Sequence, residues 1–402
     1  MNKLFYLLFL VLFSATMFAQ SQLTLNGGDI EQKHYLQKIP YRKIKEKLIV
    51  DISINGKTYH FLFDTGAPFS ISNKLYKELN PQTISMGKFH DSSGAEDSAV
   101  VISIPKLEIG GLGFINTMGA ILPEASTKML DCFGISGIIG SNMLRNSIVQ
   151  FDDKNSQIII TDNSKNLSLK RTPYQDMKLS PVQSSPYIEV ILKKGKEKAG
   201  GPVLFDCGAD GFFRMSKGMY KWLQGRPNVM DSIAAGKGSF DWSVYGFVEH
   251  QQQFALSIPE FVVNDFRFNN VFVMTTSGDE SLIGARLLEY GKATLDYRNR
   301  RFYFEPYENI NTSKLSEREW NVEVILKDEK LVVGLIWDKA LADRINLGDE
   351  VLKVGDDDYR NMSFCNLMLG EDKQFGATEK KITMELKDVK TGAIKTVEIN
   401  RL

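Results

Sequence analysis

Short segments in which apolar and polar residues alternate recur along much of the chain. The stretch 48–54 reads Leu-Ile-Val-Asp-Ile-Ser-Ile, and the stretch 187–192 reads Tyr-Ile-Glu-Val-Ile-Leu. Both are rich in β-branched residues and are bounded by turn-forming residues, which is typical of half-buried strands. The pattern predicts a protein that is mainly β.

A tight turn sets the register of the first strand pair. The dipeptide Asn55-Gly56 directly follows the first of these strands, and it is a strong signal for a two-residue hairpin turn. The second arm of the hairpin is then Lys57–Phe63, and Asp64 comes directly after it. We therefore expect the carboxylate of Asp64 at a corner where a strand enters a turn.

Two landmarks occur twice in the same order, which indicates an internal repeat. The first is an apolar strand that ends in Asp-x-Gly-Ala, with Asp64 in copy one and Asp206 in copy two. The second is an apolar pair followed by a glycine, at Gly140 and Gly284. The separation is 76 positions in copy one and 78 in copy two, and in each copy a further aspartate follows the glycine by 12 positions. This agreement predicts two similar β units.

Changes in composition divide the chain into units. A polar stretch with two prolines, 164–181, is typical of a connection between the copies, and a second change comes at 309–318. We predict one unit over 34–164, a similar one over 165–311 and a different domain over 317–402. A length of 402 residues agrees with two or three domains.

The first residues have the pattern of an export signal. Lys3 precedes an apolar run from Leu4 to Phe18, and Ala-Gln-Ser follows the run. The alternative is a membrane anchor, but the run is shorter than the ~20 apolar residues that a spanning helix needs. We expect residues 1–20 to be a cleaved signal peptide and the mature protein to be periplasmic or secreted, with no transmembrane segment left.

Charge and cysteine content argue against several other classes. Lys plus Arg and Asp plus Glu both number 49, and no basic block is present that would follow a nucleic-acid backbone. The three cysteines are an odd and sparse set, so we expect no disulfide framework. They show no metal-ligand spacing with the four histidines, so we expect neither a structural zinc nor another cofactor. These residues are Cys132, Cys207, Cys365, His34, His60, His90 and His250.

Two close carboxyl groups that share one proton can hydrolyse a peptide bond without a metal or a covalent intermediate. The ionised group deprotonates water while the protonated group donates to the substrate carbonyl. At about 3 Å and an effective dielectric near 20, two carboxylate charges repel by roughly 5 kcal/mol, so the pair does not ionise fully near neutral pH. The glycines at 66 and 208 suit such a site because they let backbone groups approach the carboxylates closely.

Both loops, with the apolar-apolar-Gly elements that follow them, resemble the pepsin and retropepsin family of aspartic proteases. The resemblance covers about residues 34–308. It implies two β-barrel lobes in one chain, a polypeptide substrate, and Asp64 and Asp206 as the catalytic pair. In that family the second glycine gives room for its element to pass beside the catalytic loop. The residues that would support the loops are Thr65, Gly66, Ala67, Cys207, Gly208 and Ala209.

The two copies differ at two positions of the loop. Copy two continues with Asp210, which resembles the retroviral residue that binds the substrate backbone, whereas copy one has Pro68. Position 207 is cysteine, where the family has Thr or Ser with a hydroxyl that bonds to the opposite loop. A thiol bonds more weakly than the hydroxyl of Thr65, so we expect a looser contact there, and an exposed thiol would be open to oxidation. A nucleophilic Cys207 is disfavoured because no histidine lies near it in sequence.

A flap hairpin that covers the substrate is expected in copy one. The stretch 87–101, with Ser-Ser-Gly at 92–94, fits that place. The corresponding region of copy two contains Phe240, Trp242 and Tyr245. These aromatic side chains either line subsites or pack in the core, and the sequence leaves both open.

The segment 317–402 differs from both copies. Its stretch 346–356 resembles the Leu-x-x-Gly-Asp turn and strand of PDZ domains, which implies a small α+β domain. PDZ domains bind chain ends or extended peptides by adding a strand to a sheet edge. The alternative is a packing module with a degenerate groove.

Two functions stay open at this point. The first is an aspartic endopeptidase that uses Asp64, Asp206 and an activated water. The second is a catalytically inactive, two-lobed peptide-binding protein in which the PDZ-like domain supplies the function and Cys207 reflects a relaxed demand on the loop. The sequence contains no HExxH, GxSxG or GxxxxGK[ST] motif. We expect the lobes to close within one monomeric chain, because both loops are present in it.

Overall fold

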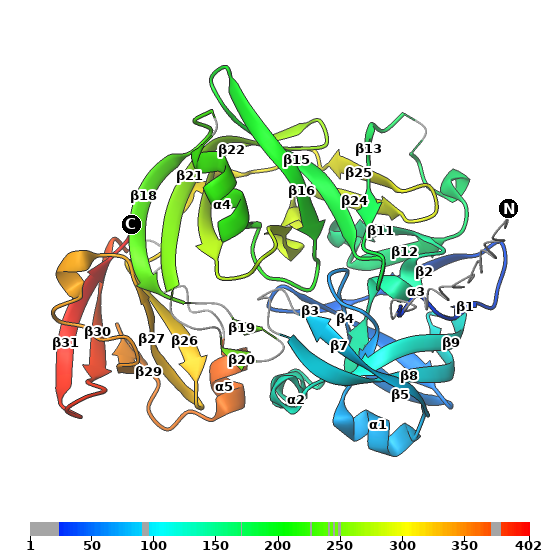
Figure 1. The fold of residues 1–402 in the computed structure, drawn as a ribbon, viewed down its shortest axis with the longest axis horizontal. Coiled ribbons are helices and arrows are strands. Elements are labelled where there is room, and N and C mark those ends of the chain that lie inside the picture. Colours follow the sequence, from blue (N-terminus) through cyan, green and yellow to red (C-terminus); the bar gives the residue numbers. More distant parts are fainter. Residues whose placement is uncertain are drawn as a thin grey trace, which may run out of the picture.

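The protein is mainly β, as the alternating pattern predicts, and Figure 1 shows strands in both halves and in the C-terminal part of the described chain. The expected signal peptide at 1–20 lies outside the described residues, as do the turn at 92–94, Phe240, Tyr245 and the side chain of Trp242. The computed structural model describes residues 24–90, 96–169, 171–225, 227–239, 242–243, 246–247, 251–370 and 379–402.

A nine-stranded sheet holds most of the first half of the chain. The expected hairpin lies at its centre: Asn55 and Gly56 have φ of 52° and 77°, the left-handed values that a tight hairpin turn requires. The sheet consists of β1 (Asp29–Ile30), β3 (Arg42–Ile44), β4 (Lys47–Ile54), β5 (Lys57–Phe63), β6 (Ser70–Ile71), β7 (Gln82–His90), β8 (Glu96–Ile109), β9 (Leu112–Ile121) and β10 (Gly137–Ile139).

The second half repeats this arrangement in a larger sheet, which continues into the C-terminal module (residues 317–402) and has 14 strands. Its second-half strands are β14 (Lys178–Leu179), β15 (Pro186–Lys194), β16 (Glu197–Phe205), β17 (Phe213–Ser216), β18 (Asp231–Gly238), β21 (Gln251–Val263), β22 (Phe266–Thr276) and β23 (Leu282–Ile283). A separate pair is formed by β19 (Trp242–Ser243) and β20 (Gly246–Phe247).

A six-stranded sheet takes strands from both halves and joins them. At its centre β11 pairs with β24 in antiparallel fashion. Buried aromatic rings connect this sheet to the strands that precede the two aspartates, because Phe151 lies 5.6 Å from Phe63 and 6.1 Å from Phe205 between ring centroids. The strands are β2 (Leu36–Pro40), β11 (Ile148–Asp152), β12 (Gln157–Thr161), β13 (Tyr174–Asp176), β24 (Gly291–Asp296) and β25 (Arg301–Pro306).

The helices are short, and two of them occupy equivalent places in the halves. Ser72 and Ser216 are the N-caps of α1 and α4, and each hydroxyl accepts a hydrogen bond from the backbone N–H three residues later. In the described part of the chain no helix has the length and apolar character to cross a membrane. The helices are α1 (Asn73–Leu79), α2 (Glu124–Cys132), α3 (Ser141–Leu144), α4 (Lys217–Gln224), α5 (Phe364–Leu369), and the 3₁₀ turns η1 (Asp153–Asn155), η2 (Ser164–Asn166), η3 (Ala285–Glu289), η4 (Ser313–Ser316) and η5 (Lys339–Leu341).

The C-terminal module extends the second-half sheet, because β27 pairs with β18. Its predicted Gly-Asp turn has a structural reason: the buried carboxylate of Asp349 accepts from the backbone N–H of Asn346 (2.7 Å) and Val389 (2.9 Å) and pairs with Lys395 (2.7 Å). The likeness to PDZ domains and the predicted domain boundaries stay predictions. The module's strands are β26 (Val322–Lys327), β27 (Lys330–Ile336), β28 (Glu350–Val354), β29 (Asp357–Asp358), β30 (Lys381–Lys387) and β31 (Ile394–Asn400).

The sequence predicts no disulfide framework, but one pair of the three cysteines is bonded. Cys132 in α2 and Cys365 in α5, 233 positions apart, are joined with an S–S distance of 2.01 Å. Beside this bond Lys128 pairs with Glu329 and lies 4.9 Å from the ring centroid of Phe364. The sequence hid the pair because only folding brings α2 and α5 together, at the lower centre of Figure 1. The C-terminal module is therefore attached to both halves.

Candidate active site

Asp64 and Asp206 occupy equivalent corners of the two halves. Asp64 follows β5, and its backbone N–H donates to the carbonyl of Ile139 in β10 at 3.0 Å. Asp206 follows β16, and its N–H donates to the carbonyl of Ile283 in β23 at 2.9 Å. In both halves these two strands run parallel. Each aspartate is thus fixed by the strand that carries the second landmark of its own copy.

The glycine of the second landmark is required by close contact with the aspartate's loop. A Cβ atom at Gly140 would lie 2.1 Å from the carbonyl carbon of Pro68. A Cβ at Gly284 would lie 2.4 Å from the carbonyl oxygen of Gly211. Both contacts are with backbone atoms, which move less readily than a side-chain end, so any larger residue would displace the loop.

Each loop holds its own carboxylate through backbone N–H groups. Oδ1 of Asp64 accepts from Gly66 (2.8 Å) and Ala67 (3.1 Å). Oδ1 of Asp206 is held in the same way, by Gly208 at 2.9 Å and Ala209 at 3.1 Å. These bonds orient both carboxyl groups and stabilise negative charge on them.

The glycines at the turns also bring the two carboxyl groups face to face. A Cβ at Gly66 would lie 2.5 Å from Cγ of Asp206, and one at Gly208 would lie 2.2 Å from Cγ of Asp64. Each loop therefore packs against the carboxyl group of the other. Both aspartates keep partial solvent exposure, which leaves room for contact with a water or a ligand.

The surroundings of Asp64 favour its protonated form. Desolvation raises the pKa of Asp64 well above its usual range, and the charge and hydrogen bond of Asp206 raise it further. The N–H of Gly66 and the charge of Lys47 act in the opposite direction but more weakly. Two carboxyl groups that face each other closely repel when both are ionised, which favours a state with one proton between them.

Thr65 and Cys207 join the two loops beneath the carboxyl groups. The hydroxyl of Thr65 donates to the carbonyl of Phe205 (2.7 Å) and accepts from the N–H of Cys207 (3.0 Å). The thiol of Cys207 makes the reciprocal bond to the carbonyl of Phe63, at 3.3 Å. Both side chains are fully buried, so the thiol is not the exposed group that would be open to oxidation. Burial raises the pKa of the Cys207 thiol far above its usual range and keeps it neutral.

Further contacts that the sequence analysis did not identify support these loops. The hydroxyl of Ser141 donates to the carbonyl of Thr65 (2.7 Å) and shares a hydrogen bond with the hydroxyl of Tyr297 (2.9 Å). Burial raises the pKa of Tyr297, which keeps its hydroxyl neutral. The available signal was the position of Ser141 directly after the glycine of the second landmark.

Asp210, expected to bind the substrate backbone, has an ionic partner within the chain. Its carboxylate lies 2.9 Å from Nζ of Lys47, at the start of β4, and its side chain is 47% exposed. Lys47 also donates to the carbonyl of Gly208 at 2.6 Å. The preceding residue, Glu46, accepts from the N–H of Gly211 (2.5 Å) and pairs with Arg286 (2.6 Å). Two charged residues of the first half thus contact the Asp206 loop.

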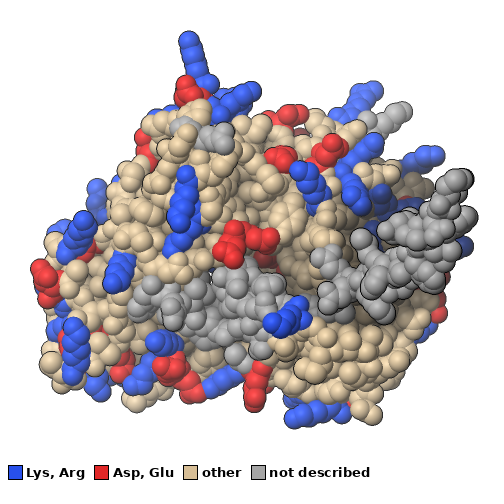
Figure 2. Space-filling model, viewed as in Figure 1, with Lys and Arg blue, Asp and Glu red and all other residues tan. Residues whose placement is uncertain are grey.

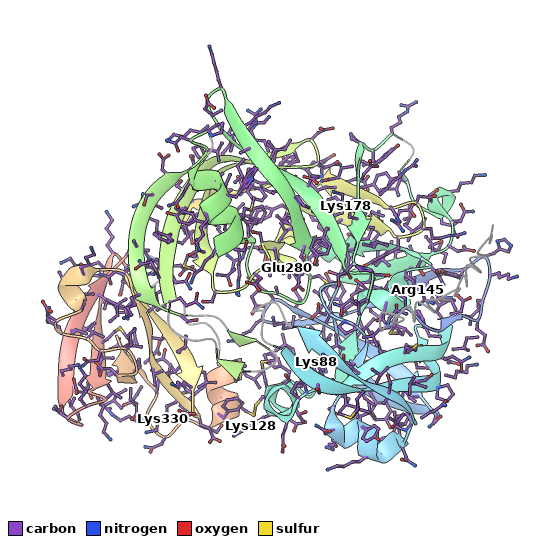
Figure 3. All side chains as sticks on the ribbon, viewed as in Figure 1. Lys88, Lys128, Arg145, Lys178, Glu280 and Lys330 are labelled. Carbon is purple, nitrogen blue, oxygen red and sulfur yellow. A yellow bond between two sulfur atoms is a disulfide. The ribbon has the colours of Figure 1, made fainter. Side chains whose placement is uncertain are left out.

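The expected flap corresponds to an antiparallel hairpin of β7 and β8. Figure 3 labels Lys88 on this hairpin and Glu280 in the segment before β23, and both lie toward the centre of the view. Glu280 accepts a hydrogen bond from the hydroxyl of Tyr187. Figure 2 shows acidic residues gathered at the centre of the same face. Within the described ranges, no group of three or more His, Cys, Asp or Glu side chains is arranged to hold a metal ion.

Comparison with known proteins matches residues 50–143 to a family model described as aspartyl protease. This stretch contains the Asp64 loop and Gly140 and spans less than a quarter of the 402 residues. Among solved structures, the chain is similar to basic 7S globulin from soybean, with 11% sequence identity and a TM-score of 0.40, over 70% of this chain and 98% of that chain. No curated protein sequence matches the chain.

Proposed function

We propose that the chain is an aspartic endopeptidase in which Asp64 and Asp206 activate a water for attack on a peptide bond. The observation that carries this proposal is the close approach of the two loops, in which Gly66 packs against the carboxyl group of Asp206 and Gly208 against that of Asp64. The strongly raised pKa of Asp64 agrees with it. The partial exposure of both groups supports it, because a substrate has to reach them. The aspartyl protease match over residues 50–143 agrees with it independently.

The proposed reaction needs only the groups at the two corners. The ionised carboxylate takes a proton from a water as the water attacks the peptide carbonyl. The protonated carboxyl donates its proton to the developing oxyanion. As the tetrahedral intermediate collapses, the carboxyl group that took the proton of the water passes it to the leaving amine, and the other carboxylate takes a proton from a hydroxyl of the intermediate. The N–H groups of the two loops hold the carboxylates in place throughout. Cys207 takes no chemical part, because its neutral thiol is buried beneath the pair.

We further propose that the protein is exported, acts as a monomer and uses the C-terminal module to bind an extended peptide or a chain end. Among the described strands β26 pairs with β27 alone. The other edge of β26, which pairs with no described strand, suits the addition of a further strand, which is how sheet edges bind peptides. This edge supports the expectation of a peptide-binding module.

A catalytically inactive peptide-binding protein remains the second candidate, and Cys207 is the observation in its favour. A thiol is a poorer hydrogen-bonding group than the hydroxyl expected at this position. Its bond to the carbonyl of Phe63 weakens this candidate, because the contact between the loops is kept. In this second candidate, the peptide would bind at the same edge of β26 in the C-terminal module.

Proteolysis of an unfolded protein distinguishes the two candidates. The purified protein, Asp64→Asn and Asp206→Asn are incubated with reduced, carboxymethylated casein from pH 3 to pH 8, with and without a statine-type transition-state mimic. We expect cleavage by the parent protein alone and its inhibition by the mimic. Identical fragment patterns from all three proteins would contradict the proposal and favour the binding protein.

A further inference from the structure

The two halves place different side chains at one equivalent position near the carboxyl pair. A hairpin precedes each aspartate, and its register aligns the two halves. Ile49 pairs with Leu62, two positions before Asp64, and Tyr187 pairs with Leu204, two positions before Asp206. Two positions before Ile49 and Tyr187 lie Lys47 in the first half and Ser185 in the second. The comparison therefore aligns a lysine with a serine.

Both aligned residues bind the turn glycine of the opposite loop. Ser185 donates its hydroxyl to the carbonyl of Gly66 at 3.2 Å, and Gln183 donates to the same oxygen at 2.9 Å. Lys47 donates to the carbonyl of Gly208 at 2.6 Å. The contact is thus neutral on one side of the site and made by an ammonium group on the other.

The ammonium group of Lys47 lies close to Asp64, although it contacts the loop of Asp206. Gly208, whose carbonyl it binds, is the residue that packs against the carboxyl group of Asp64. The side chain of Lys47 is 20% exposed, so water screens its charge only in part. That charge lowers the pKa of Asp64 against the larger effect of desolvation.

The other charged groups around the pair do not cancel the difference in charge between the Lys47 side and the Ser185 side of the site. Asp210 is the direct counterion of Lys47, at 2.9 Å, but it is more exposed than the lysine. Glu46 is paired with Arg286, so this ion pair adds little net charge. The remaining titratable groups that interact with Asp64 are Asp206 and Cys207, both on the second loop, and Tyr297, whose buried hydroxyl is neutral.

We propose that Lys47 is a positioning residue of the carboxyl pair: it holds the Asp206 loop against Asp64 and places a positive charge beside the pair, so that the pair keeps its single negative charge to lower pH. The inference deepens the proposed function and rests on it for its kinetic test. Ser185, at the equivalent place in the second half, holds the opposite loop without adding a charge.

The kinetic test is the pH profile of kcat/KM for the full-length parent, Lys47→Gln and Lys47→Arg. In Lys47→Gln we expect the acid limb to move to higher pH, with a severalfold loss at a pH on that limb relative to the variant's own maximum. Lys47→Arg keeps the charge, so its limb should stay near that of the parent. Ser185→Ala removes the equivalent neutral contact and should leave the position of the limb unchanged.

A second readout does not depend on turnover. The protein is labelled with ¹³C at the aspartate carboxyl carbons, Asp64→Asn and Asp206→Asn identify the signals of the pair, and the pair is titrated in the parent and in Lys47→Gln. We expect the first ionisation of the pair to move to higher pH in the variant. An unmoved titration, or a loss of activity by one factor at every pH, would overturn the inference. A parent that cleaves nothing would defeat the proposed function, and the titration would still decide this inference.

Discussion

The loop after β5 and the loop after β16 are built on one backbone plan but carry different side chains. Both hold an aspartate by two N–H groups, and in both a glycine packs against the opposite carboxyl group. They differ where a side chain reaches across: Thr65 is matched by Cys207, and Lys47 is matched by Ser185. The backbone thus makes the two carboxyl groups alike in position, while the side chains make them unlike in environment. An acid and a base placed side by side require that combination.

The largest expected effect comes from removing either carboxyl group. Asp64→Asn and Asp206→Asn should each lower proteolytic kcat by about 100-fold or more, because one of the two proton-transfer steps loses its group. The rate of casein cleavage at the optimal pH measures the effect, and circular dichroism serves as the control for folding. If one variant kept most of its activity, the two loops would not be equal partners in the reaction.

The next largest effect comes from replacing Gly140 or Gly284, the glycines of the second landmark, and the loss of stability should differ between the two halves. Gly140→Ala places a Cβ within 2.1 Å of loop backbone, whereas Gly284→Ala places one at 2.4 Å. Both should destabilise the protein by about 1–3 kcal/mol, the first more than the second, because an overpacked site has to displace its surroundings. Urea denaturation measures the difference. Equal stability of Gly140→Ala and the parent would mean that the loop yields without cost.

A smaller effect compares the two cross-loop hydrogen bonds. Thr65→Val leaves the N–H of Cys207 and the carbonyl of Phe205 without this partner, which should cost about 2 kcal/mol. Cys207→Ala removes one weaker bond, so about 1 kcal/mol is expected. Cys207→Thr should tighten the contact if the pocket accepts the added methyl. The ranking is measured by urea denaturation, and a larger loss in Cys207→Ala would reverse the proposed order of the two contacts.

The smallest effect is on the pH dependence of stability. The raised pKa of Asp64 means that the folded protein keeps a proton that the unfolded chain releases near the ordinary carboxyl pKa of about 4. The stability that this proton contributes is complete below that pH and is lost as pH rises toward the folded-state pKa. Asp64→Asn has no such proton, so between pH 4 and pH 7 its Tm should fall less than that of the parent. If the curves of Tm against pH were parallel for the parent and Asp64→Asn, Asp64 would ionise like an ordinary carboxyl group.

The parts of this picture that depend on local residue patterns could be predicted from the sequence. Asn55-Gly56 fixes a hairpin by its own backbone preferences, and the aspartate corners follow from the strands before them. For a third repeated element, the sequence comparison identified the aspartate but missed the asparagine that follows it. The aspartates that end β11 and β24 each accept from an asparagine three residues later, Asn155 and Asn299, so Asp-x-x-Asn is common to both copies.

The parts that depend on contacts between distant segments could not be predicted. Cys132 and Cys365 meet only because α5 docks on α2, and no local pattern encodes that contact. Lys47 lies in an ordinary strand of the first half, and its partners Gly208 and Asp210 lie far along the chain. The burial of Cys207 likewise follows from the closure of one loop on the other, and the residue type alone leaves both buried and exposed positions open.

The state of the proton between Asp64 and Asp206 tests the account most directly. Neutron diffraction from deuterated crystals of the full-length protein at about pH 5 would locate the deuterium atoms on the two carboxyl groups. The account predicts one deuteron shared by the pair, with the facing oxygens within hydrogen-bonding distance or bridged by a single water. Two ionised carboxylates, or carboxyl groups too far apart for either contact, would contradict it.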